Sequence, residues 1–130
     1  MLHELGYDIR KPGLGTSLGP EGSHCGAGAP RFDVVTTDGF FFVGCSSPPP
    51  DVETDGEGWI RLRWGVAGVV MGFKPPTFAL LPITGTVQRI VIVFDEAQDV
   101  FGGPDEFGAA ILDNIDVNGT LVGQGSTTAN

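Results

Sequence analysis

The residues best suited to ligand recognition lie in the segment WIRLRW (59–64), where Trp59, Arg61 and Arg63 alternate with apolar residues. Alternate side chains of an extended strand point to the same face. An exposed indole can cover the apolar face of a sugar ring, and guanidinium groups can donate hydrogen bonds to its hydroxyls. The same side chains would also suit a protein interface, or they could pack beneath the proline-rich segment that precedes them. The first interpretation predicts a glycan-binding surface.

A second set of candidate ligands is the acidic segment that follows the apolar run 87–94. It contains five carboxylates within twelve residues: Asp95, Glu96, Asp99, Asp105 and Glu106. Hard oxygen ligands on a glycine-containing segment are what calcium prefers, although the spacing does not match an EF-hand. The alternative is a solvated acidic loop that keeps a sheet edge from pairing. The calcium hypothesis takes Asp95, Glu96, Asp99 and Asp113 as its ligands.

Asp113 belongs to the apolar segment ILDNIDV near the C-terminus. Strict alternation places it on the inward face together with Ile111 and Ile115. A buried carboxylate without a partner is costly, so we expect Asp113 to contact calcium or an arginine such as Arg31.

The chain has two cysteines, Cys25 and Cys45, which bracket the segment RFDVVTTDGFFFV. In a glycine-rich acidic chain this favours one disulfide formed in an oxidising compartment, with two unrelated buried thiols as the alternative. A zinc site is disfavoured, because only His3 and His24 could complete it and the cysteine spacing fits no zinc motif.

No set of residues points to catalysis. A nucleophile triad needs a positioned histidine, but His3 lies near the terminus and His24 lies beside Cys25. The formal net charge of −9 disfavours nucleic acid and anionic membrane surfaces as partners. No apolar run approaches the length of a membrane-spanning helix. We therefore expect a soluble protein that is not an enzyme.

The elements that position these residues are strands. The chain of 130 residues is rich in glycine and proline, and its apolar residues alternate with polar ones in short runs. Asp38-Gly39 and Asn118-Gly119 predict two tight hairpin turns. The segment VQRIVIVF is apolar on both faces, which predicts a central strand covered on each side. Segments 65–85 predict only irregular strand pieces or a packed loop.

These features predict an all-β fold, an antiparallel β-sandwich or jelly roll of about seven or eight strands. Residues 1–123 are expected to form a single domain, and residues 124–130 a flexible tail.

Two segments carry a resemblance to a known group of proteins. Residues 25–32 read Cys-Gly-x-Gly-x-Pro-Arg-Phe, and residues 112–115 read Leu-Asp-Asn-Ile in the last long strand. In this the chain resembles secreted bacterial proteins that are similar to jelly-roll carbohydrate-binding modules. The resemblance implies a β-sandwich fold and a structural calcium near Asp113 and Asp116.

The leading functional hypothesis is thus an extracellular or cell-surface binding module for polysaccharide. The alternative is a structural subunit that forms a homo-oligomer or fibre by exchanging a strand or terminus.

Overall fold

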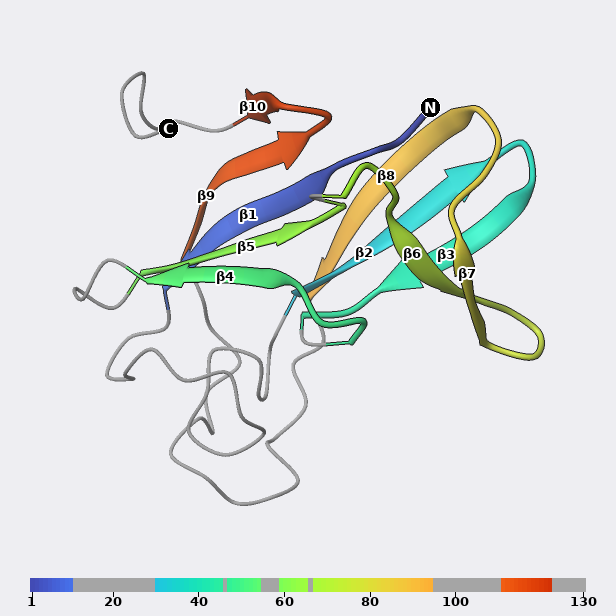
Figure 1. The fold of residues 1–130 in the computed structure, drawn as a ribbon, viewed down its shortest axis with the longest axis horizontal. Coiled ribbons are helices and arrows are strands. Elements are labelled where there is room, and N and C mark those ends of the chain that lie inside the picture. The colour runs from blue at the N-terminus through green and yellow to red at the C-terminus, as the bar shows by residue number, and fades with distance from the viewer. Residues whose placement is uncertain (11–29, 46, 55–58, 66, 95–110, 123–130) are drawn as a thin grey trace, which may run out of the picture.

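A computed structural model of the protein describes residues 1–10, 30–45, 47–54, 59–65, 67–94 and 111–122. These residues form two antiparallel sheets of five strands each (Figure 1). In spatial order the first sheet comprises β10 (Thr120–Val122), β9 (Ile111–Val117), β1 (Leu5–Arg10), β5 (Ile60–Trp64) and β4 (Asp51–Thr54). The second comprises β7 (Ala79–Pro82), β6 (Met71–Lys74), β3 (Gly39–Val43), β2 (Pro30–Thr36) and β8 (Val87–Phe94).

The all-β class is confirmed, with more strands than the seven or eight expected. The proline-rich connection contains β4, because residues 51–54 pair with β5. The region expected to be irregular forms the hairpin of β6 and β7, in which Gly72 pairs with Leu81. This described part of the chain contains no helix long and apolar enough to cross a membrane.

One hydrophobic core lies between the two sheets. The alternation in β1 and β5 is confirmed, because Leu5, Tyr7 and Ile9 and likewise Ile60, Leu62 and Trp64 are buried. Tyr7, Phe32 and Trp64 form an aromatic group at the centre, with ring centroids 5.5 to 5.9 Å apart. The polar atoms of this group are satisfied: Tyr7 Oη donates to Pro30 O and Trp64 Nε1 donates to Pro48 O. This packing joins the two sheets in the manner of a sandwich.

Both predicted hairpins form. Asn118 and Gly119, with φ of 53° and 85°, are the two central residues between β9 and β10, as a type I′ turn requires. The other turn is displaced by one residue, because Thr36 pairs with Gly39 and leaves Thr37 and Asp38 at the centre.

The prediction for VQRIVIVF is wrong in one respect. This segment forms β8, which lies at the edge of the second sheet that the described residues form, rather than in its centre. Its inward residues pack against the core, which accounts for one apolar face. Its outward Val91 is 38% exposed, so the second apolar face is not covered by the described residues.

The structure describes only one of the two cysteines of the predicted disulfide. Cys45 follows β3, is buried, and is not a free thiol. Its expected partner Cys25 lies outside the described residues, as does the predicted tail of residues 124–130.

Candidate functional site

The outward face of the first sheet carries a group of polar and charged side chains. Because Leu5, Tyr7 and Ile9 point into the core, the residues between them, Gly6 and Asp8, point outward. Strand register then places Arg61 beside Asp8, and both Arg63 and Asp116 beside Gly6. We call the resulting set the charged cluster: Glu4, Asp8, Arg61, Arg63, Asn114 and Asp116.

Asp8 is the centre of this cluster. Arg61 contacts it in a fork, with Nε 3.0 Å from Oδ1 and Nη2 3.1 Å from Oδ2. Arg63 Nη2 lies 3.3 Å from the same Oδ1, and Asn114 Nδ2 donates to Oδ2 at 2.9 Å. Two guanidinium groups and an amide thus surround one carboxylate, which holds both arginines in fixed orientations.

Arg63 crosses over β1 to reach β9. Its Nε lies 3.5 Å from Asp116 Oδ2, and its Nη1 donates to Leu62 O at 2.8 Å. The crossing is possible because residue 6 is glycine: a Cβ there would collide with the Cδ of Arg63 and the carbonyl of Leu62. Gly6 is therefore part of the construction of the site, although it has no side chain.

Asn114 enters the cluster through an irregularity in β9. Between the pairs Asp8–Asp113 and Gly6–Asp116, β9 has one residue more than β1, and Asn114 adopts a φ of 47°. Such a bulge turns the side chains that follow it.

The bulge corrects the prediction for Asp113. Ile111 is 51% exposed, whereas Leu112, Ile115 and Val117 pack against the core. The extra residue changes the phase of the alternation between Asp113 and Ile115. Asp113, which pairs with the outward Asp8, therefore lies on the outward face with Ile111 and not on the inward face with Ile115. Its Oδ1 instead accepts from Asn114 N at 2.7 Å, and Arg31 ion-pairs with Asp33 on its own strand.

Two carboxyl groups of the cluster, Asp8 and Glu4, have pKa values that are shifted in opposite directions. Burial acts to raise the pKa of Asp8, but hydrogen bonds from Arg61 and Asn114, with the charges of Arg61 and Arg63, outweigh it and lower the pKa. The pKa of Glu4 is raised, first by a hydrogen bond with the carboxyl group of Asp116 and then by burial and the charge of Asp116. Arg63 opposes this shift only in part.

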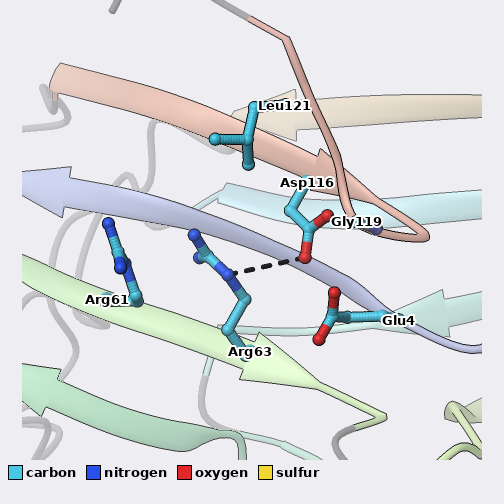
Figure 2. Close-up of a pocket in the computed structure, with 6 residues that line it drawn as sticks. All are labelled: Glu4, Arg61, Arg63, Asp116, Gly119 and Leu121. Carbon is cyan, nitrogen blue, oxygen red and sulfur yellow. Dashed lines mark hydrogen bonds and ion pairs between the residues drawn. The ribbon is translucent and has the colours of Figure 1, made fainter. Parts of the chain in front are cut away.

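An open depression of about 200 Å³ lies over the part of the cluster that contains Glu4, Arg63 and Asp116 (Figure 2). Figure 2 shows the carboxyl groups of Glu4 and Asp116 facing each other, with the guanidinium group of Arg63 beside Asp116. The residues that line the depression are Glu4, Arg61, Arg63, Asp116, Gly119 and Leu121. The depression thus presents guanidinium donors, carboxylate acceptors and one aliphatic side chain, a combination that suits a hydroxyl-rich ligand.

The β9–β10 turn holds the N-terminal segment beside this depression. Asn118 Oδ1 accepts from His3 N at 2.7 Å and from Glu4 N at 3.2 Å. Asn118 Nδ2 donates to Met1 O at 3.0 Å, and Asn118 N donates to Glu4 O at 2.9 Å. One asparagine therefore fixes the backbone that carries Glu4.

The structure brings together two of the three predicted sugar-binding residues. Arg61 and Arg63 line the depression, but they are only partly exposed and contact carboxylates of the sheet. Trp59 is half-buried, precedes β5, and is not among the lining residues.

Three of the four predicted calcium ligands, Asp95, Glu96 and Asp99, lie outside the described residues. The other two carboxylates of that acidic segment, Asp105 and Glu106, lie outside them as well. Asp113 is described and half-buried on β9. Within the ranges that the structure covers, no three His, Cys, Asp or Glu side chains form a group that could hold a metal.

Sequence reasoning did not identify Glu4, Asp8, Asn114 or Leu121 as site residues. The available signal was local: Asp8 occupies an outward position of a predicted strand, as Arg61 and Arg63 do in another. Only the pairing of β1 with β5 and β9 shows that these outward positions are neighbours.

Comparison of the chain with protein-family models, with curated proteins and with solved structures gave no match.

Proposed function

We propose that the chain is a non-catalytic extracellular binding module of jelly-roll type, and that its ligand is a glycan or another hydroxyl-rich cell-surface polymer. The observation that carries the proposal is the depression in which Arg61, Arg63, Glu4 and Asp116 converge. Contacts with Asp8 and Asp116 hold the two arginines in place before any ligand arrives. Donors fixed in advance lose little conformational freedom on binding, which favours affinity.

Each group has a defined role in this proposal. The guanidinium groups donate to sugar hydroxyls and the carboxyl groups of Glu4 and Asp116 accept from them, while Leu121 contacts the apolar C–H groups of a ring. Trp59 is the candidate for stacking against a neighbouring sugar. The chemistry is that of recognition, and no step of bond cleavage is assigned.

Calcium enters the proposal only as a structural ion held by Asp95, Glu96, Asp99 and Asp113. A ligand that binds only the folded state raises its stability by mass action. Calcium is therefore expected to raise the melting temperature, and a chelator to lower it. Equal melting temperatures in both would remove the ion from the proposal.

The direct test is retention of the purified protein on a panel of insoluble polysaccharides and bacterial cell walls. Leu121 pairs with Asp116, so Leu121→Arg fills the depression and competes with Arg63 for that carboxylate. We expect retention to weaken by about tenfold, which corresponds to ~1.4 kcal/mol. The matched control is Val122→Arg, because Val122 is on the same short strand, is 56% exposed and does not line the depression.

Retention that Leu121→Arg weakens and Val122→Arg preserves would support this site. No retention of the unmodified protein on any polymer would contradict the glycan hypothesis. If large assemblies formed in the same sample, the alternative of a structural subunit would replace it.

A further inference from the structure

The edge strand β8 differs from the other three sheet edges of the described structure. β4, β7 and β10 have only three or four residues each, β4 carries two acidic residues and β7 ends in Pro82. Short length, charge and proline are the usual devices that keep an edge from pairing. β8 has eight residues, no proline, and Arg89 as its only charged residue.

The side chains of β8 are incompletely buried. Phe32 and Val34 on the neighbouring β2 are fully buried, but their partners on β8, Ile92 and Ile90, are only half-buried. Val91 on the outward face is 38% exposed. Among the described residues only β2 pairs with β8, so its second row of backbone donors and acceptors faces away from the sheet. Within the described ranges, the strand therefore has no second neighbour that covers both its backbone and its apolar side chains.

We propose that β8 pairs antiparallel with β8 of a second copy of this chain, which joins the two second sheets into one continuous sheet. Among the described sheet edges, only β8 itself offers a partner strand of more than four residues. An antiparallel contact of identical strands is self-complementary, as a twofold interface requires.

The sequence of β8 fits a twofold axis through Ile92. Val91 then lies opposite Val93 on the outward face, and Ile90 lies opposite Phe94 on the inward face, so apolar residues meet on both sides. The two Arg89 side chains lie at opposite ends of the paired segment, about 20 Å apart along the strands, which avoids a contact between like charges.

Such an interface involves fewer residues than the roughly 20 to 30 per partner of a standard interface. We therefore expect a reversible dimer that forms in the micromolar range. Each dimer presents two copies of the depression, so its binding to an immobilised polymer gains from avidity.

The test is sedimentation equilibrium of the unmodified chain from low to high micromolar concentration, with hydrogen exchange measured on the same samples. We expect a monomer–dimer equilibrium and amide protection of residues 90–94 that increases with concentration. Val91→Lys places a charge on the strand and should weaken the dimer by at least about tenfold. The matched control is Val52→Lys on β4, where Val52 is 41% exposed, and we expect it to leave the dimer intact.

Three results would overturn the proposal. The first is a monomer at every concentration, including the case in which β8 amides are protected throughout because the same chain covers them. The second is a dimer in which the exchange of residues 90–94 does not depend on concentration. The third is equal weakening by Val91→Lys and Val52→Lys. The exchange measurement on the unmodified chain keeps the proposal testable if Val91→Lys fails to fold.

Discussion

Glu4 and Asp116 place two carboxyl groups in hydrogen-bond contact, and the pKa of Glu4 is raised as a result. A carboxyl group with a raised pKa in the folded state stabilises the fold below its unfolded pKa, and this contribution is lost as the pH rises through the folded pKa. Glu4→Gln keeps a hydrogen-bond donor without the charge. We expect its melting temperature to exceed that of the unmodified protein at pH 7 and this difference to shrink towards pH 4.

Thermal melts of both proteins across this pH range measure the effect. The matched control is Glu53→Gln on β4, because Glu53 is exposed and acts on Arg61 only through its charge. A pH-independent difference for Glu4→Gln would contradict the shared hydrogen bond.

Gly6 makes a second prediction at the scale of one residue. Gly6→Ala places a methyl group where Arg63 crosses β1, and overpacking of this kind costs about 1 to 3 kcal/mol. We expect unfolding in urea to show this loss. In a double-mutant cycle with Arg63→Ala, the two losses should sum to more than the loss in the double variant, because removing Arg63 relieves part of the collision. Additive losses would show that Arg63 does not lie over Gly6.

At the scale of elements, the sequence predicted strands whose faces are regular and failed where a strand departs from alternation. Leu5, Tyr7 and Ile9 were placed correctly because every second residue of β1 is apolar. The bulge at Asn114 was not predicted, because an extra residue in β9 is defined only by its pairing with β1 and cannot be seen in the sequence of either strand alone. Apolar residues on both faces likewise predicted a central strand for β8. Such a pattern shows that both faces can be buried, but it does not show which strands or layers lie next to them.

Asn118 gives a prediction at the same scale, because it connects the β9–β10 turn to the N-terminal segment. Asn118→Gly keeps a residue that tolerates the positive φ but removes three side-chain hydrogen bonds. We expect a loss of about 1 to 2 kcal/mol and faster exchange of the His3 and Glu4 amides. Asn114→Gly is the matched control, since Asn114 also has a positive φ but contacts Asp8. Equal exchange in the two variants would contradict this role of Asn118.

At the scale of the whole molecule, the charged cluster couples stability to pH. The pKa of Asp8 is lowered, so its contribution is present above the unfolded pKa and is lost as the pH falls through the folded pKa. Asp8→Asn leaves Arg61 and Arg63 without their shared carboxylate, and we expect a loss of roughly 2 to 3 kcal/mol at pH 7. The loss should shrink in acid, because the carboxyl group of Asp8 in the unmodified protein is then protonated and, like the asparagine, carries no charge.

Urea unfolding at several pH values measures this dependence. Asp33→Asn provides a matched comparison, because Asp33 has one ion pair on a more exposed strand face. A loss that is equal for both variants at every pH would contradict the central role of Asp8.

The position of β1 has a consequence for how the molecule folds. Unlike β2, β4, β6 and β9, each of which pairs with the strand that follows it in the sequence, β1 pairs only with distant strands. Its Asp8 meets Arg61, 53 residues away, and Asn114, 106 residues away. Closing such long loops is slow compared with hairpin formation. During synthesis β1 must therefore wait unpaired until β5 has been made, and its other side stays unpaired until β9 has been made. The charged cluster, which needs residues of all three strands, is complete only after β9.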